Sequence, residues 1–180
     1  MKKIFSVIVF IFLVVIFAQA QDATAVISTM RMGIFKLKLT TAEIEKAMGQ
    51  KIKVKHKQDS YLDTAKIMYN QANYILSFSK RYNDNATAPE IWELFAVSSA
   101  NTALKTKSGM GINNTKAEIL STYDKNDITI NNDWQYKEKG NVKDKIQFIS
   151  ISDYDAGTVL VFKTEDRVVK SMEVSLYQGE

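Results

Sequence analysis

The pattern of apolar and polar residues divides the chain after about residue 20. Two lysines at positions 2 and 3 precede an almost continuous apolar run at 4–17, and Ala18-Gln19-Ala20 follows it. A basic start, a short apolar stretch and a small-x-small ending are typical of a cleavable secretory signal peptide. The run is too short for a membrane-spanning helix, which needs about 20 apolar residues. We therefore expect a signal peptide at 1–20, and a mature protein that works in the periplasm or outside the cell without contacting a membrane.

Two predicted helices begin with the same motif, 75 positions apart in the sequence. Thr40 and Glu43 form a Thr-x-x-Glu sequence, and Thr115 and Glu118 repeat it. In such a capping box the threonine hydroxyl accepts a hydrogen bond from a free amide of the first turn, and the glutamate accepts one from the cap amide. Apolar residues then recur at helical spacing, and Gly49 is expected to end the first helix. Both helices are short, so we expect them to need a sheet to pack against.

Alternation with a period of two predicts four strands after each helix. Turn residues such as Asn131-Asn132-Asp133 and Asp155-Ala156-Gly157 separate them. The predicted strands are 52–56, 64–69, 74–80 and 91–99 in the first half, and 128–130, 145–153, 158–163 and 168–177 in the second.

Matching segments in the same order indicate an internal repeat. Besides the helix starts, Ile75-Leu76-Ser77-Phe78 matches Val159-Leu160-Val161-Phe162, and Ala96-Val97-Ser98 matches Glu173-Val174-Ser175. We expect one α+β domain at 21–180, built of two tandem repeats at about 32–104 and 105–180. Each repeat is predicted to be a short capped helix followed by an antiparallel four-stranded meander, with the helices packed on one face of the sheet.

A duplicated unit of capped helix and antiparallel meander resembles the β-lactamase inhibitor protein family and its one-copy relatives, the SmpA/OmlA-type envelope proteins. The helix entry of that family reads Gly-Met-Thr-x-x-x-Val. This chain has the threonine and a β-branched residue four positions on, but Lys38-Leu39 and Asn113-Asn114 replace Gly-Met. It also lacks the cysteines usual in that family. The resemblance implies the duplicated fold and a binding or inhibitory role, and it carries over no inhibitory residue.

The repeat also sorts the strand residues into two faces. Ile91, Phe95 and Val97 match Val168, Met172 and Val174, and we assign all six to the helix-covered core. The opposite face then includes Val169 and Glu173, and it presents large apolar and aromatic side chains, which are frequent anchors of protein interfaces. The expected partner-binding residues are Trp92, Leu94, Val159, Val161 and Tyr177. The alternative is that residues 22–33 fold over this face and bury it.

Charge and cysteine content narrow the possible partners. The chain has 24 basic and 20 acidic residues, and loss of the signal peptide removes two lysines, so the mature protein is close to neutral. That balance gives no support for nucleic-acid binding. The chain has no cysteine, so it can form neither a disulfide framework nor a lipid attachment through cysteine.

No catalytic, cofactor or metal site is predicted. His56 is the single histidine and has no cysteine or second histidine as partner. We expect it to be a half-buried strand residue, with a general base as the alternative.

Two further motifs have both a structural and a functional interpretation. The alternate lysines of Lys51–Lys57 are expected to protect an edge strand from pairing, and the alternative is a docking strip for an anionic partner. Asp153 and Asp155 form an Asp-x-Asp-x-Gly sequence that fits a hairpin turn. The alternative is a calcium loop, but Thr164 stands at the twelfth position, where such a loop needs a glutamate.

The sequence therefore predicts an exported protein that is not an enzyme and that binds or inhibits a protein partner through the open face of its sheet. One alternative is an envelope structural or assembly accessory protein with a similar fold. Another is a hydrolase that uses carboxylates alone.

Overall fold

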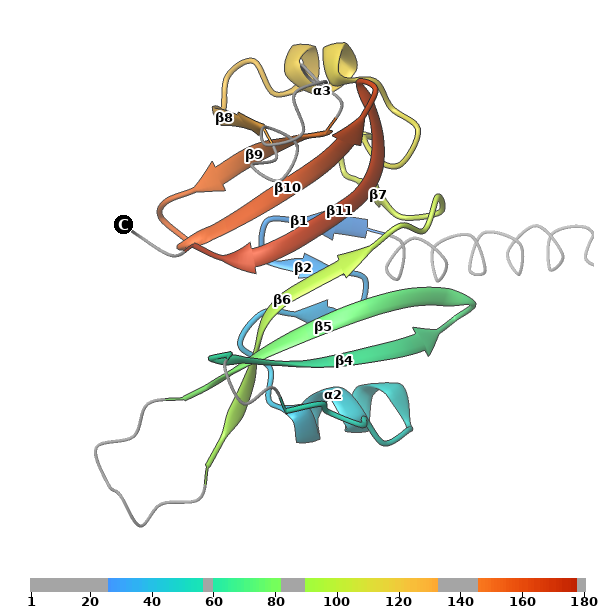
Figure 1. Cartoon of the computed structure of the whole chain (residues 1–180), viewed down its shortest axis with the longest axis vertical. Helices are drawn as coiled ribbons and strands as arrows, with labels where there is room; N and C mark the ends of the chain where they lie inside the picture. The colour runs from blue at the N-terminus through green and yellow to red at the C-terminus, as the bar shows by residue number, and fades with distance from the viewer. Residues whose placement is uncertain (1–25, 57–59, 82–89, 133–145, 178–180) are drawn as a thin grey trace, which may run out of the picture.

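A computed structural model describes residues 26–56, 60–81, 90–132 and 146–177 of the chain, and the predicted signal peptide lies outside these ranges. The prediction of an α+β protein is confirmed. Two short helices accompany a seven-stranded antiparallel sheet and a four-stranded mixed sheet, so that strands dominate the fold (Figure 1).

The two helices are α2 (Thr41–Met48) and α3 (Lys116–Thr122), and both have the predicted capping box. The Glu43 amide donates to the Thr40 hydroxyl at 3.3 Å, and the Thr40 amide donates to the Glu43 carboxylate at 2.8 Å. The corresponding distances for Thr115 and Glu118 are 3.3 and 2.6 Å. Gly49 ends α2 with a positive φ of 70°, as predicted.

The large sheet has the strand order β4-β5-β6-β11-β10-β9-β8. Its strands are β4 (Leu62–Tyr69), β5 (Ala72–Lys80), β6 (Trp92–Ser99), β8 (Asp127–Asn132), β9 (Ile146–Asp153), β10 (Thr158–Glu165) and β11 (Val168–Leu176). Pairing of β6 with β11 joins the two halves of the chain in the middle of the sheet. Figure 1 shows α2 at the β4 end of this sheet and α3 at the β8 end. The predicted strand at 52–56 is reduced to one bridge between Lys55 and Thr64.

The small sheet was not predicted from the sequence. Its strands, in sheet order, are β3 (Phe35–Lys36), β2 (Arg31–Met32), β1 (Val26–Ser28) and β7 (Lys105–Thr106). Phe35 is fully buried, and its ring centroid lies 4.7 Å from that of Tyr74 on β5.

The core lies on one face of the large sheet, which we call the helix side. Alternate residues of β5 and β10 are buried there together with one isoleucine from each helix: Leu76, Phe78, Leu160, Phe162, Ile44 and Ile119. Tyr74 belongs to the same cluster, so the small sheet also packs on the helix side. The alternative that residues 22–33 cover the opposite face is therefore wrong for 26–33, the part that is described.

The opposite face of the large sheet is called the open face here. From β5 and β10 it carries Ile75, Ser77, Val159 and Val161, which confirms the predicted faces of these two strands. In the described ranges, no helix or strand lies across it.

Two β-bulges change the alternation in β6 and β11. In β6, Ala96 pairs with Ser77 whereas Leu94 pairs with Phe78, so that Phe95 is an extra residue. Lys170 is the corresponding extra residue of β11. Because a bulge adds one residue to one strand, every residue beyond it faces the side opposite to the one that strict alternation predicts.

The bulges correct several predicted faces. Leu94 is 0 % exposed and lies on the helix side beneath the strands, and Trp92 packs against the same core. Val169 is also buried there, although alternation places it outside. Phe95, which was predicted to be core, is partly exposed at the bulge.

Candidate functional site

Three of the five predicted binding residues lie on the open face. Val159 and Val161 are half-buried on β10, and Tyr177 is exposed directly after β11. The prediction is wrong for Trp92 and Leu94, because the bulge at Phe95 turns both toward the helix side. The candidate binding surface therefore lies nearer the middle of the sheet than the sequence indicated.

Small side chains form the floor of the open face. Ser77, Ala96, Ser175 and Val159 are successive register partners across β5, β6, β11 and β10. Ala96 and Ser175 are only 6 % and 7 % exposed, although no described helix or strand covers them. Short side chains lie below the tips of their larger neighbours, so this floor is recessed.

The next row of register partners has a carboxylate at its centre. It consists of Ile75, Ser98, Glu173 and Val161, from the same four strands. The Glu173 side chain reaches solvent, but neighbouring strands displace part of its water, and this desolvation raises the pKa of its carboxyl. Sequence reasoning placed Glu173 on this face but gave it no role.

Apolar side chains stand around this floor. Ile75 is 43 % exposed, and Met68 on β4 is also exposed. At the end of β11, the Tyr177 ring packs edge-on against Tyr154, with their centroids 5.5 Å apart. Small residues with exposed apolar side chains beside them form a surface that a partner can contact and desolvate.

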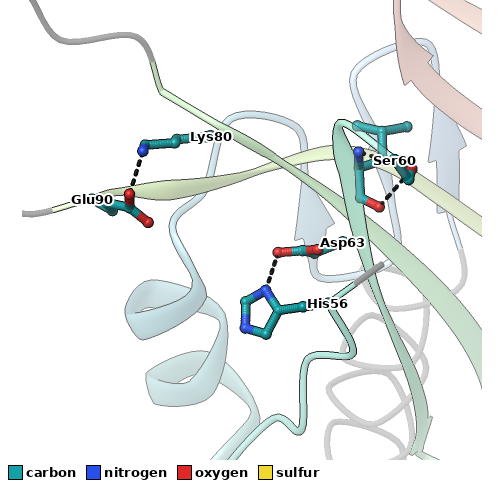
Figure 2. Close-up of polar contacts among 6 residues, drawn as sticks. His56, Ser60, Asp63, Lys80 and Glu90 are labelled. Atoms are coloured by element: carbon teal, nitrogen blue, oxygen red, sulfur yellow. Dashed lines mark hydrogen bonds and ion pairs between the residues drawn. The ribbon is translucent and has the colours of Figure 1, made fainter. Parts of the chain in front are cut away.

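A separate polar pair, His56 and Asp63, lies at the β4 edge on the helix side (Figure 2). The two side chains point toward each other, and His56 Nδ1 lies 2.5 Å from the Asp63 carboxylate. Asp63 is 3 % exposed, whereas His56 is exposed rather than half-buried as predicted. Trp92 lies beside them, with its ring centroid 5.8 Å from that of His56.

A histidine oriented by a buried carboxylate is one part of a nucleophile–base system. The other parts are missing in the described ranges, where no hydroxyl is hydrogen-bonded to the imidazole. Ser60, whose hydroxyl is drawn in Figure 2, instead forms hydrogen bonds with the backbone of Leu62. The sequence did not reveal Asp63 as the partner because the two residues meet only across the Lys55–Thr64 bridge.

The two open alternatives at Asp153 and Lys51 have local structural explanations. Asp153 is the last residue of β9, before the turn to β10, and its two carboxylate oxygens accept from the Ala156 amide and from the Thr29 hydroxyl. Lys51 pairs with Glu45 of α2 at 2.7 Å. Lys53 and Lys55 are exposed as expected, and Lys57 lies outside the described residues.

Among the described residues, no three histidine, cysteine or acidic side chains come together as a metal-binding group. No described helix combines the length and the apolar composition that crossing a membrane requires. Comparison of the chain with protein-family models, with curated proteins and with solved structures finds no match.

Proposed function

We propose that this protein is an exported, non-catalytic module that binds or inhibits a protein partner through the open face of its seven-stranded sheet. The observation that carries the proposal is the row of small side chains at Ala96 and Ser175, with half-buried Val159 and Val161 and exposed Ile75 beside it. Exposed apolar groups grouped on a sheet mark interaction surfaces more often than single scattered ones do.

We also propose that the chain is a tandem repeat of about 32–104 and 105–180. In its support, contacts beside each helix recur with an offset of 75 residues. Lys38 and Asn113 both have a positive φ, of 68° and 72°, two positions before their caps. The Lys38 amide donates to the Leu94 carbonyl at 2.8 Å, and the Asn113 amide donates to the Val169 carbonyl at 3.1 Å.

The bulges fit the same offset, because the extra residue follows Leu94 in one strand and Val169 in the other. With this offset Ser98 corresponds to Glu173. The sequence match of Ala96-Val97-Ser98 with Glu173-Val174-Ser175 has an offset of 77 residues, so it is shifted by two residues from this structural alignment.

The proposed repeat also supports the proposal that the His56–Asp63 pair is not catalytic. Asn132 and Gln147 are register partners at the β8–β9 end of the sheet, and the Gln147 amide donates to Asn132 at 2.9 Å. His56 and Asp63 occupy the corresponding place next to the Lys55–Thr64 bridge. An amide pair offers no proton chemistry, so the shared position favours a structural role for the His56–Asp63 pair.

The relation to the β-lactamase inhibitor protein family stays a proposal of the same kind. It is supported by the two threonine-capped helices and the meanders that follow them. It assigns no inhibitory residue and names no target.

Co-purification from the exported fraction of the protein's own cells tests the binding role. Ile75→Arg places a charge on the open face, and Ile130→Arg places one on the helix-side edge of β8, where exposure is similar (43 % and 40 %). We expect Ile75→Arg to reduce the captured partner at least about tenfold, and Ile130→Arg to leave it unchanged. Equal capture by both variants would remove the open face as the binding surface.

A further inference from the structure

Glu173 holds the central position of the open face. It lies opposite Ser98 in the β6–β11 pair, which joins the two halves of the sheet. In the proposed repeat, Ser98 and Glu173 are equivalent to each other, so the pair lies on the axis that relates the repeats. One half has a serine there and the other has a carboxylate.

No cation within the described ranges neutralises this carboxylate. Lys163 is the nearest lysine along β10, but its ammonium lies 5.6 Å from the centroid of the Phe148 ring on β9, on the far side of β10 from Glu173. Lys66 is separated from Glu173 by β5 and β6. Glu173 forms neither a hydrogen bond nor an ion pair with any described side chain.

The side chain of Glu173 reaches solvent, and the strands beside it displace part of its water without offering a charge in exchange. The raised pKa of Glu173 has this desolvation as its cause. A bound cation would supply the missing charge. The remaining groups around it, Ser98, Ser171 and Ser175, are neutral hydroxyls that can accept hydrogen bonds.

We propose that the open face receives a basic side chain of a protein partner, arginine by preference, which pairs with Glu173 while its stem packs between Ile75 and Val161. This inference rests on the proposed binding function. Arginine fits better than lysine because its planar guanidinium has five donors, enough for a carboxylate and for neighbouring hydroxyls at once. Charge complementarity at the centre of a surface, with apolar contacts beside it, is the arrangement of an interface anchor.

Selection from a phage-displayed library of random twelve-residue peptides, panned against the whole protein, tests this proposal. We expect the enriched peptides to share an arginine or lysine. A fluorescently labelled selected peptide should then bind Glu173→Gln at least about tenfold more weakly than the unchanged protein. Glu165→Gln removes the same charge from the end of β10 and should change the affinity less than about twofold.

Carbon-13 NMR of the Glu173 carboxyl gives a second readout. Addition of the peptide should lower the pKa of this carboxyl, because a paired cation favours the ionised form. A role of Glu173 in folding alone would leave that pKa unchanged.

The outcomes separate the two proposals. If Ile75→Arg abolishes peptide binding and Glu173→Gln leaves it intact, the inference about Glu173 is overturned while the open-face function stands. Enriched peptides without basic residues would have the same meaning. Binding that resists both substitutions, or a selection that enriches nothing, would count against both.

Discussion

At the scale of single residues, the buried carboxylate of Asp63 depends on one partner. His56 provides its only hydrogen bond within the described ranges, at 2.5 Å. We expect His56→Ala to lower the free energy of unfolding by about 1–3 kcal/mol, because a buried acceptor is then left unsatisfied. Urea denaturation measures this, with Lys55→Ala on the same segment as the control, expected within about 0.5 kcal/mol of the unchanged protein.

A double substitution distinguishes this explanation from simple loss of packing. Asp63→Asn removes the charge that needs a partner, so His56→Ala should cost less in that background than in the unchanged protein. Equal costs in both backgrounds would show that the pair contributes nothing specific.

The carboxyl of Glu173 makes the stability of the protein depend on pH in the unusual direction. Its pKa in the folded state is raised above the ordinary 4.5, so folding favours the protonated form. Stability from this group is therefore present at low pH and is lost as pH rises through 4.5 and the raised pKa. Glu173→Gln should thus gain stability relative to the unchanged protein as pH increases across this range. Parallel melts of both proteins at several pH values check the sign. A stability advantage of Glu173→Gln that grows as the pH falls would contradict the prediction.

At the scale of elements, the two capping boxes are the features that the sequence predicted best. A cap depends on residues three positions apart, so its signal is local and survives without knowledge of the fold. Thr40→Ala and Thr115→Ala should each cost about 0.5–2 kcal/mol, and the costs should add in the double variant. Thr41→Ala, one position into α2, is the matched control and should cost nothing, since alanine favours helix. A silent Thr40→Ala or Thr115→Ala would contradict the cap at that helix.

Strand positions were predictable, but strand faces were predictable only where a strand is regular. Period-two alternation locates β5, β10 and their buried residues correctly, because both strands are regular. The bulges at Phe95 and Lys170 leave no signal in the alternation, so Trp92, Leu94 and Val169 were assigned to the wrong face. A bulge is set by pairing with the neighbouring strand, which a single sequence does not contain.

Three other features depend on pairing that no local pattern in the sequence shows. Strands β2, β3 and β7 have two residues each, too few to show a period. The His56–Asp63 pair forms across a bridge, and Glu173 becomes central only once β11 pairs with β6. Sequence reasoning therefore located the open face from β10 and Tyr177 but missed its centre.

At the scale of the molecule, pairing of β6 with β11 makes one continuous sheet from both halves. The helices and the small sheet use one face of it as the core, and the other face carries a recessed floor with exposed apolar neighbours. We propose that this division makes one face structural and leaves the other available to a partner.

Site-specific photo-crosslinking tests that claim most directly. The photoreactive residue p-benzoylphenylalanine replaces Ile75 on the open face in one variant and Ile130 on the helix side in another, at positions of similar exposure. Irradiation in the exported fraction should give a discrete crosslinked protein from position 75, and none from position 130. Crosslinks from position 130 alone, or none from position 75 under conditions where the partner co-purifies, would contradict the open face as the functional surface.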